Sequence, residues 1–321
     1  MGVVVILGTG GTIAGTGPDP SAPWRYTAAQ LSIDQLVSAV PGLAGVPLEA
    51  RQVAQVDSKD MGWSVWQDLG RALAAELARD EVDGVVVTHG TDTLEETALL
   101  LHHLVDVPKP VVLTAAMRPA TAVDADGPGN LRDAVGLVRA AAAQGRHGVV
   151  AVLAGRAWAG AEVRKAHSHE VDAFDGGGAP ALAETDAQGQ WPQAMPVWPA
   201  ALARGWALLA LARPPRVELV CSHADADGWL VDALLAHSRS GSPTERLRGL
   251  VVAATGHGTL HQGLEAALGR AEQAGVVVWR SSRTAQGGVL SREGDRWPAA
   301  GPVTAAQARV ALLLSLLSPV A

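Results

Sequence analysis

Two short apolar runs in this chain are each followed by a loop of glycine and threonine. Val3–Leu7 precedes the loop Gly8–Gly15, and Val85–Val87 precedes the loop Thr88–Thr93. Continuous apolar runs rich in β-branched residues are typical of strands buried on both faces, as in a parallel sheet covered by helices. Loops of this composition present threonine hydroxyl groups on a backbone that a substrate can approach closely. We therefore expect an α/β fold in which both loops belong to one active site.

Strand-like and helix-like stretches alternate along the first half of the chain. This alternation predicts a parallel sheet, and such sheets bind ligands at the carboxyl ends of their strands. The predicted strands are Val3–Leu7, Leu48–Val53, Gly84–Thr88, Pro110–Ala115 and Gly148–Leu153. The predicted helices are Ser32–Ala39, Trp63–Arg79, Leu94–His103 and Asn130–Gln144.

Sequence rich in glycine and proline separates this region from a second, shorter alternation. Between about residues 176 and 215 apolar periodicity is sparse, as in a connecting segment. We predict an N-terminal α/β catalytic domain over residues 1–190, a linker over 191–214 and a smaller C-terminal α/β domain over 215–321. The strands predicted in the second domain are Arg216–Cys221, Leu250–Ala254 and Val276–Arg280. The helices predicted there are Trp229–His237, Leu260–Gln273 and Ala305–Leu317.

The charge and composition of the chain indicate which partners it lacks and in which compartment it works. The 321 residues carry a formal net charge of −7 and no basic stripe, which argues against a nucleic-acid partner. No apolar run is long enough to span a membrane, and the first one is too short for a secretory signal. We therefore expect a cytoplasmic enzyme. Cys221 is the only cysteine, which excludes an intramolecular disulfide, and its place in a predicted strand indicates a small core residue.

The first loop has an alternative interpretation as a phosphate cradle. Gly8 and Gly10 fit the start of a dinucleotide fingerprint, but Ile13 stands where its third glycine belongs. The pattern GxxxxGK[ST] is absent, so nucleotide binding is disfavoured. In the other interpretation, Gly10 and Gly11 bring backbone N–H groups against a substrate while Thr12 attacks it.

The second loop has an alternative interpretation as a helix start. Thr93 and Glu96 have the spacing of a capping box, and Asp92 is a suitable N-cap residue. Capping requires a single hydroxyl or carboxylate, whereas Thr91, Asp92 and Thr93 supply three such groups in succession. This excess favours chemistry over capping.

Two further residues are candidates for proton transfer or for closing the site. Lys165 is either solvated or, if held beside Asp92 and a threonine, able to accept a proton. Tyr26 is the only tyrosine and lies in a turn-rich loop that could close over a site.

Histidine pairs with metal-like spacing occur at His167–His169 and His257–His261. Neither matches HExxH, and no carboxylate completes a ligand set, so we expect no metal and no cofactor.

Five motifs, in the same order, resemble those of the bacterial-type L-asparaginases. They are Thr9–Gly15, Asp57–Met61, Thr88–Ala98, Lys109–Pro119 and Asp126–Leu131, and Ser281–Arg283 extends the resemblance into the second domain. The resemblance implies a two-domain α/β amidohydrolase with a flavodoxin-like N-terminal domain and no cofactor. It also implies hydrolysis of L-asparagine to L-aspartate and ammonia, with weaker action on L-glutamine. The assembly that it implies is a homotetramer, or at least an intimate homodimer, in which a neighbouring subunit completes each site.

The same resemblance implies roles for individual residues. Thr12 would be the nucleophile, assisted by Tyr26 on a lid, and Thr91, Asp92 and Lys165 would form a second triad. The residues that would bind the substrate are Gly11, Asp57, Ser58, Gly90, Ala116 and Glu293. Glu293 is the best match to a carboxylate expected after Ser281–Arg283.

Lys59 departs from the family pattern, because many relatives carry glutamine or glutamate after the serine at position 58. A cation here would repel the substrate's ammonium group unless Lys59 points away or pairs with Asp57 or Asp60.

The order of the chemical steps and the function itself have alternatives. An acyl-threonine intermediate at Thr12 competes with direct attack by water under Thr91 and Lys165. Two other functions fit the scaffold: the ammonia-releasing subunit of a tRNA-dependent amidotransferase, and a catalytically silent amino-acid-binding protein. The amidotransferase subunit usually has an additional N-terminal domain, and here the first predicted strand begins at Val3.

Overall fold

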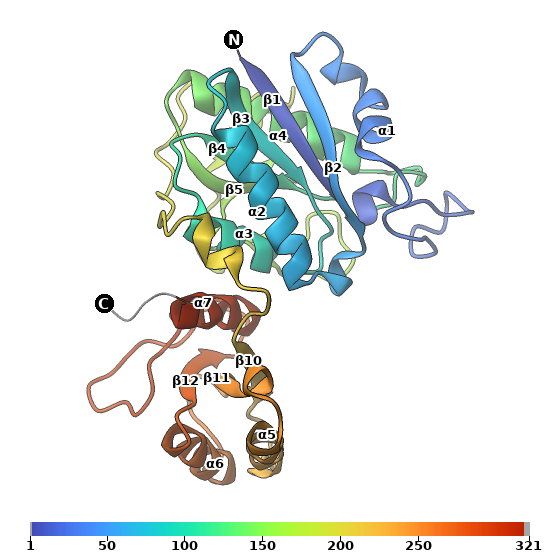
Figure 1. Cartoon of the computed structure of the whole chain (residues 1–321). Coiled ribbons are helices and arrows are strands. Elements are labelled where there is room, and N and C mark those ends of the chain that lie inside the picture. The colour runs from blue at the N-terminus through green and yellow to red at the C-terminus, as the bar shows by residue number, and fades with distance from the viewer. Residues whose placement is uncertain (1, 318–321) are drawn as a thin grey trace. The chain divides into compact units, whose positions relative to one another are not determined.

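The computed structural model of the chain describes residues 2–317, which form two compact units with the boundary between Ala210 and Leu211 (Figure 1). Met195 and Trp198 lie in the segment predicted as a linker, and both are buried in the core of the first unit.

A seven-stranded sheet forms the centre of the first unit, in the order β2-β1-β3-β4-β5-β6-β9. Its strands are β1 (Val3–Gly10), β2 (Leu48–Val56), β3 (Val82–Thr88), β4 (Pro110–Thr114), β5 (Gly148–Leu153), β6 (Arg156–Ala159) and β9 (Ala183–Glu184). The first five are parallel, and their order is that of flavodoxin-like sheets. The predicted α/β fold with a flavodoxin-like first domain is therefore confirmed.

Helices cover both faces of this sheet (Figure 1). They are α1 (Ile33–Ser38) and α4 (Gly127–Ala143) on one face, and α2 (Trp63–Leu77) and α3 (Leu94–Leu104) on the other. Alternate residues of each strand point to opposite faces, so Ile6 packs in the core with α1 and α4, while Leu7 packs in the core with α2 and α3. Burial on both faces explains why β1 and β3 are apolar without alternation.

The far edge of the sheet is antiparallel, which the sequence analysis did not predict. β6 pairs with β5 through a two-residue turn in which Ala154 and Gly155 have φ values of 49° and 71°. Positive φ at both central residues is the geometry of a tight hairpin turn, and β9 then pairs antiparallel with β6. The sheet is therefore mixed, with its parallel part at the two threonine loops. A separate two-stranded sheet pairs β7 (Arg164–Lys165) with β8 (Phe174–Asp175).

The second unit is a smaller α/β structure, as predicted. Its strands β10 (Arg216–Cys221), β11 (Leu247–Ala254) and β12 (Val277–Ser282) are parallel and adjacent in that order. Its helices are α5 (Trp229–Ser240), α6 (Gln262–Gln273) and α7 (Ala305–Leu317). Cys221 is exposed at the end of the edge strand β10, so the expectation that it lies in the core is wrong.

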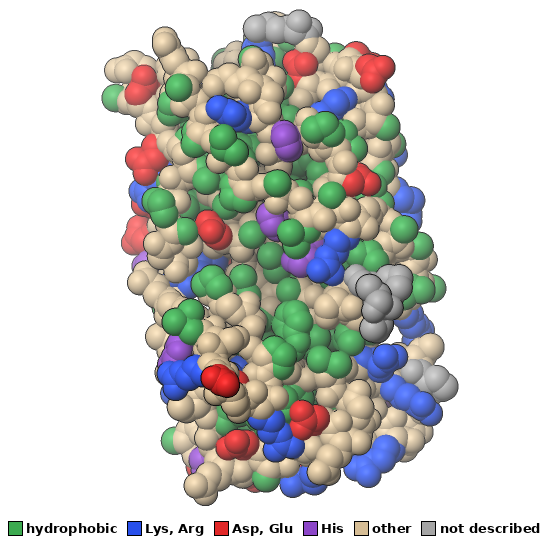
Figure 2. Space-filling model, turned by 90° about the vertical axis from the view of Figure 1, so that its left-hand side faces the viewer, with side chains coloured by type: hydrophobic (Ala, Val, Ile, Leu, Met, Phe, Trp, Pro, Cys, Tyr) green, Lys and Arg blue, Asp and Glu red, His purple; other side chains and the backbone are tan. Residues whose placement is uncertain are grey.

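None of the described helices combines the length and the apolar character that a membrane span requires. Figure 2 shows acidic and basic side chains interspersed over much of one face of the molecule, with several basic ones near its lower right edge.

Candidate active site

The first threonine loop follows β1 and turns sharply at glycine. Gly11, with φ +81°, precedes a short 3₁₀ helix, Thr12–Ala14. Thr12 is buried, and its Oγ1 is hydrogen-bonded to the hydroxyl of Tyr26 at 2.9 Å. The structure thus brings together the two residues predicted to form the nucleophile and its assistant.

The second threonine loop follows β3 and is joined to Lys165 of β7. The ammonium group of Lys165 donates to Thr91 Oγ1 at 2.9 Å and to Asp92 Oδ1 at 2.7 Å. The backbone N–H of Lys165 donates to Glu95 Oε2 at 2.9 Å, which fixes β7 beside α3. Thr91, Asp92 and Lys165 therefore form the contiguous group that the sequence predicted.

The two loops meet because β1 and β3 are adjacent in the sheet, at the point where the strand order reverses. Open α/β sheets bind their ligands at such a point. Thr12 and Thr91 line one pocket of about 420 Å³. The other lining residues are Pro23, Trp24, Tyr26, Asp92, Met117, Arg118, Lys165, Ser168 and His169.

Glycine allows the backbones of the two loops to touch. A Cβ atom on Gly11 would lie 2.3 Å from Gly90 Cα, and one on Gly90 would lie 2.4 Å from Ser58 Oγ. Both distances are far inside van der Waals contact, so neither position accommodates a side chain without separating the loops.

Gly11→Ala should therefore cost more stability than its backbone angle alone explains. Gly45→Ala is the matched control, because Gly45 has φ +80° and nothing within 4 Å of its added Cβ. We expect Gly45→Ala to lower the free energy of unfolding by about 1–2 kcal/mol. Gly11→Ala should lower it by a further 1–3 kcal/mol, roughly the cost of overpacking together with the strain of its ψ of −169°, a region that only glycine adopts readily. Equal losses in urea unfolding would show that the contact with Gly90 is not tight.

Ser58 links a third segment to the second loop. Ser58 Oγ accepts the backbone N–H of Asp92 at 3.2 Å, and the Thr93 hydroxyl donates to the Ser58 carbonyl at 2.8 Å. Thr93 is the N-cap residue of α3 but makes no side-chain capping hydrogen bond. The capping interpretation of Thr93 is therefore wrong, since its hydroxyl holds the Ser58 loop instead.

Lys59 is paired with carboxylates of its own loop. Its ammonium group forms an ion pair with Asp60 and lies 3.8 Å from Asp57 Oδ2. The hydrogen bond to Asp60 raises the pKa of Lys59. The sequence predicts that a cation at position 59 is tolerated if it pairs with Asp57 or Asp60. The structure shows this pairing.

His89 is a buried residue of the second loop whose role sequence analysis missed. Its Nδ1 lies 2.7 Å from the Gly90 carbonyl, and its Nε2 lies 3.0 Å from Thr97 Oγ1. The Gly90 carbonyl can only accept, so Nδ1 carries the proton of the neutral imidazole and Nε2 accepts the Thr97 hydroxyl proton. Trp66 Nε1–H donates to the same Thr97 oxygen at 2.9 Å. This chain of hydrogen bonds orients the Gly90–Thr91 peptide.

Acid should destabilise the protein through His89. Burial lowers the pKa of His89 to about 4, below its ordinary value near 6.5. Between these two values only the unfolded state binds the proton, so the free energy of unfolding should fall as the pH drops from 6.5 to 4, by about 3 kcal/mol at most. His89→Gln should make this part of the pH profile less steep, while His102 and His103, whose pKa values burial also lowers, keep their share of the slope. Parallel profiles for the wild type and His89→Gln in urea unfolding would contradict the assignment.

Ala116 is buried just beyond β4, and the next two residues lie on the pocket. The Asp126 carboxylate accepts the backbone N–H groups of Met117 and Arg118 at 3.0 and 2.9 Å. Burial raises the pKa of Asp126, while these hydrogen bonds oppose the rise. Asn130 Nδ2 donates to the Ala115 carbonyl at 2.9 Å. Asp126 and Asn130 thus shape this rim, a role that their motif alone did not reveal.

The two remaining predicted substrate-binding residues, Asp57 and Glu293, lie in different units of the structure. Asp57 caps the 3₁₀ helix Ser58–Asp60 and accepts the Lys59 backbone N–H at 3.4 Å. Glu293 is exposed in the second unit, between β12 and α7, and its part in the site stays a prediction.

Among the described residues, His167, His169 and Glu170 form one group of three possible metal ligands, with donor atoms within 4.8 Å of one another. All three side chains are exposed, and His167 Nδ1 already accepts the backbone N–H groups of His169 and Glu170. The expectation of no metal stays a prediction.

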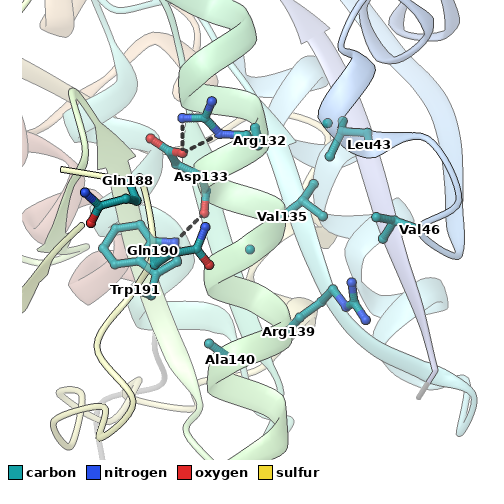
Figure 3. A pocket seen from close by; sticks show the side chains of 13 residues that line it. Leu43, Val46, Arg132, Asp133, Val135, Arg139, Ala140, Gln188, Gln190 and Trp191 are labelled. Carbon is teal, nitrogen blue, oxygen red and sulfur yellow. Dashed lines mark hydrogen bonds and ion pairs between the residues drawn. The ribbon is translucent and has the colours of Figure 1, made fainter. Parts of the chain in front are cut away.

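A second pocket of the first unit, of about 380 Å³, lies along α4 (Figure 3). Arg132 is paired there with Asp133 at 2.8 Å, and the Trp191 indole N–H donates to the Asp133 carbonyl at 2.8 Å. Serine, threonine, cysteine and lysine are absent from its described lining, so it offers no hydroxyl, thiol or amine nucleophile, and its one carboxylate, Asp133, is paired with Arg132. The pocket that holds Thr12 and Thr91 is therefore the candidate active site.

Comparison with known proteins gives the same family along both units. The model "Asparaginase, N-terminal" matches residues 3–196, and "Glutaminase/Asparaginase C-terminal domain" matches residues 216–319. A glutaminase-asparaginase of Pseudomonas fluorescens biotype A is 30% identical over 98% of this chain and 86% of its own length. L-asparaginase 2 of Escherichia coli (strain K12) is 33% identical over 98% of this chain and 88% of its own length. The crystal structure of a probable cytoplasmic L-asparaginase from Campylobacter jejuni has a TM-score of 0.90 and 34% identity, and covers 99% of this chain and 96% of that one.

Proposed function

Because the chain belongs to the glutaminase/asparaginase family of hydrolases, we propose that it converts L-asparagine to L-aspartate and ammonia, with weaker action on L-glutamine. The observation that carries this proposal is the pocket lined by Thr12 hydrogen-bonded to Tyr26 and by Thr91 hydrogen-bonded to Lys165. Two activated hydroxyl groups on one small cavity suit the attack on a carboxamide, which is a poor electrophile.

In the proposed reaction, Thr12 Oγ attacks the side-chain amide carbon, its proton passes to the Tyr26 oxygen, and the Tyr26 hydroxyl proton passes to the leaving nitrogen. Ammonia then leaves, and an acyl-threonine ester remains on Thr12. A water molecule attacks this ester and passes a proton through the Thr91 hydroxyl to Lys165, which acts in this step as the neutral amine, and the proton returns to Thr12 Oγ as aspartate is released. Each step needs a group within hydrogen-bonding reach of the proton that moves, which the 2.9 Å contacts at Thr12 and Thr91 support.

Backbone N–H groups would stabilise the negative charge that develops on the amide oxygen. The N–H of Gly11 is engaged by the Val56 carbonyl at 2.9 Å, so we assign this task to Thr12 and to the Gly90–Thr91 turn. The loss of one such donor typically slows catalysis about 100- to 1,000-fold.

The rest of the substrate would be held by groups around the same pocket. We propose that Ser58 and Asp92 bind the α-carboxylate and α-amino groups, with Asp57 beside them, and that the Ala116 carbonyl contacts the side-chain amide. Glu293 would come from a neighbouring subunit of a homotetramer, or at least of an intimate homodimer.

The word "cytoplasmic" in the name of the Campylobacter jejuni protein supports the same compartment for this chain.

A coupled assay of ammonia release tests the function, with L-asparagine, L-glutamine and no amide as its three arms. We expect faster release from L-asparagine than from L-glutamine, and no release without an amide. Silence with both amides would instead favour an amino-acid-binding protein. Mass spectrometry of the quenched reaction should find the acyl group on Thr12, and an adduct on Thr91 would reverse the assignment of the nucleophile.

A further inference from the structure

The segment Thr16–Thr27, here called the lid, brings two aromatic side chains to the candidate active site. Backbone hydrogen bonds between Thr16 and Thr27, at 3.0 and 2.9 Å, close its base. Tyr26 contacts Thr12, and Trp24 lines the same pocket although 74% of its surface is exposed. Ala22 is the one buried residue of the lid, and the exposed indole shows that Trp24 is not held by packing into the core.

The lid is held mainly by one other segment, Met117–Asp124, here called the strap. Within the described chain, hydrogen bonds from residues 17–26 to residues beyond the lid reach Thr12, Thr121 and Val123. Thr121 Oγ1 accepts the Gly17 N–H at 2.8 Å and donates to the Gly17 carbonyl at 3.3 Å. Val123 N–H donates to the Pro20 carbonyl at 3.3 Å. Thr121 is the one strap residue whose side chain makes the connection, so a substitution can remove it.

The strap itself is fixed to the frame of the site. Asp126 holds its first two residues, as described above, and Arg118 reaches from it to a second wall of the pocket. Arg118 Nη1–H donates to the His169 carbonyl at 2.7 Å, and Arg118 Nε lies 3.1 Å from Asp124 Oδ2. The strap therefore gives the lid a rigid partner that also contacts the loop after Lys165.

We propose that Thr121 is a positioning residue that latches the lid onto the strap and so keeps Tyr26 against Thr12. The effect of the latch on catalysis rests on the proposed function, whereas its effect on the lid does not. Both hydrogen bonds go to the backbone of one lid residue, so a single hydroxyl restrains the lid at its narrow base. Thr121 is exposed and lies in a loop, so a change there leaves the core intact.

Trypsin provides a direct measure of lid opening in the intact chain. Arg25 is the only lysine or arginine within residues 1–27, so cleavage after it produces a single defined fragment, Met1–Arg25, which is detected after denaturation because it contains β1. A protease requires its substrate segment to unfold locally, and the cleavage rate then follows the population of the open form.

Thr121→Val removes the hydroxyl and keeps the shape of the side chain, whereas Thr121→Ser keeps the hydroxyl. The loss of two neutral hydrogen bonds should raise the initial rate of cleavage after Arg25 by about 5- to 30-fold in Thr121→Val. Thr121→Ser should stay within about twofold of the wild type. In the ammonia assay, kcat follows the closed population, so it should fall in Thr121→Val by a smaller factor than the cleavage rate rises, and it should recover in Thr121→Ser. Thr244→Val, in the second unit, is the control for loss of an exposed threonine hydroxyl and should leave cleavage after Arg25 unchanged.

The cleavage rate decides whether Thr121 latches the lid, and kcat decides whether the latch positions Tyr26. Equal cleavage after Arg25 in the wild type and Thr121→Val would overturn the latch, even if kcat fell. Faster cleavage in Thr121→Val that Thr121→Ser reverses would support it, even if neither amide proved to be a substrate. Faster cleavage with an unchanged kcat would overturn the role of Thr121 in positioning Tyr26.

Discussion

A Thr12→Val enzyme should release ammonia from L-asparagine roughly 1,000-fold more slowly than the wild type, or more slowly still, as when other hydrolases lose their nucleophile. Valine keeps the branched shape of the buried side chain, so the 3₁₀ helix Thr12–Ala14 and the contact between Gly11 and Gly90 should survive. What is lost is the hydroxyl that lies 2.9 Å from Tyr26 and that we propose as the attacking group. Because the other pocket groups remain, kcat should fall much more than the affinity for L-aspartate.

Two variants make the Thr12 result specific. Thr12→Ser retains an attacking hydroxyl and should recover much of the lost rate. Thr9→Val removes a nearby buried hydroxyl, which donates to the Thr88 carbonyl at 2.9 Å and joins β1 to β3. Thr9→Val should lower the free energy of unfolding by about 1 kcal/mol or more and leave kcat within a few-fold. If Thr12→Val kept a tenth of the wild-type kcat, Thr12 would not be the nucleophile.

The strands of the first unit could be predicted because burial on both faces removes polar residues from them. Val3–Leu7 and Gly148–Leu153 are continuous apolar runs, and the structure places strands over both. β6 was not predicted because a strand of four residues is too short to show a recognisable hydrophobic pattern. In addition, the turn before it contains Ala154, and alanine is uncommon at positive φ. The antiparallel edge is therefore a consequence of one local turn rather than of hydrophobic periodicity.

The convergence of the two threonine loops depends on strand order, which alternation alone does not specify. β1 and β3 are separated by a whole strand and two helices in the sequence, yet they are neighbours in the sheet. The resemblance to a family supplied the expectation that Thr12, Thr91 and Lys165 share a site. It did not supply the supporting contacts of His89 or Thr121, because those depend on which backbone groups lie opposite each side chain. The prediction that Cys221 lies in the core was wrong for a similar reason, because a strand pattern does not distinguish an edge strand from a central one.

Lys165→Met should lower kcat for L-asparagine by about 100- to 10,000-fold, the usual range for loss of a general acid or base. Methionine can fill the space of the lysine stem, but it leaves Thr91 Oγ1 and Asp92 Oδ1 without the ammonium group that contacts both. Lys109→Met is the matched control, because Lys109 donates to the Arg79 carbonyl away from the pocket and should leave kcat within about twofold.

The Lys165 variant also separates the two orders of chemical steps. If Thr12 attacks first and the Thr91–Lys165 pair activates the water, Lys165→Met should slow the second step more than the first. An acyl group should then accumulate on Thr12 and be visible by mass spectrometry of the quenched enzyme, while Thr12→Val shows none. A slow Lys165→Met enzyme that never carries an adduct would instead favour direct attack by water. A Lys165→Met enzyme with nearly full activity would remove Lys165 from the mechanism, because its contacts with Thr91 and Asp92 would then serve the structure alone.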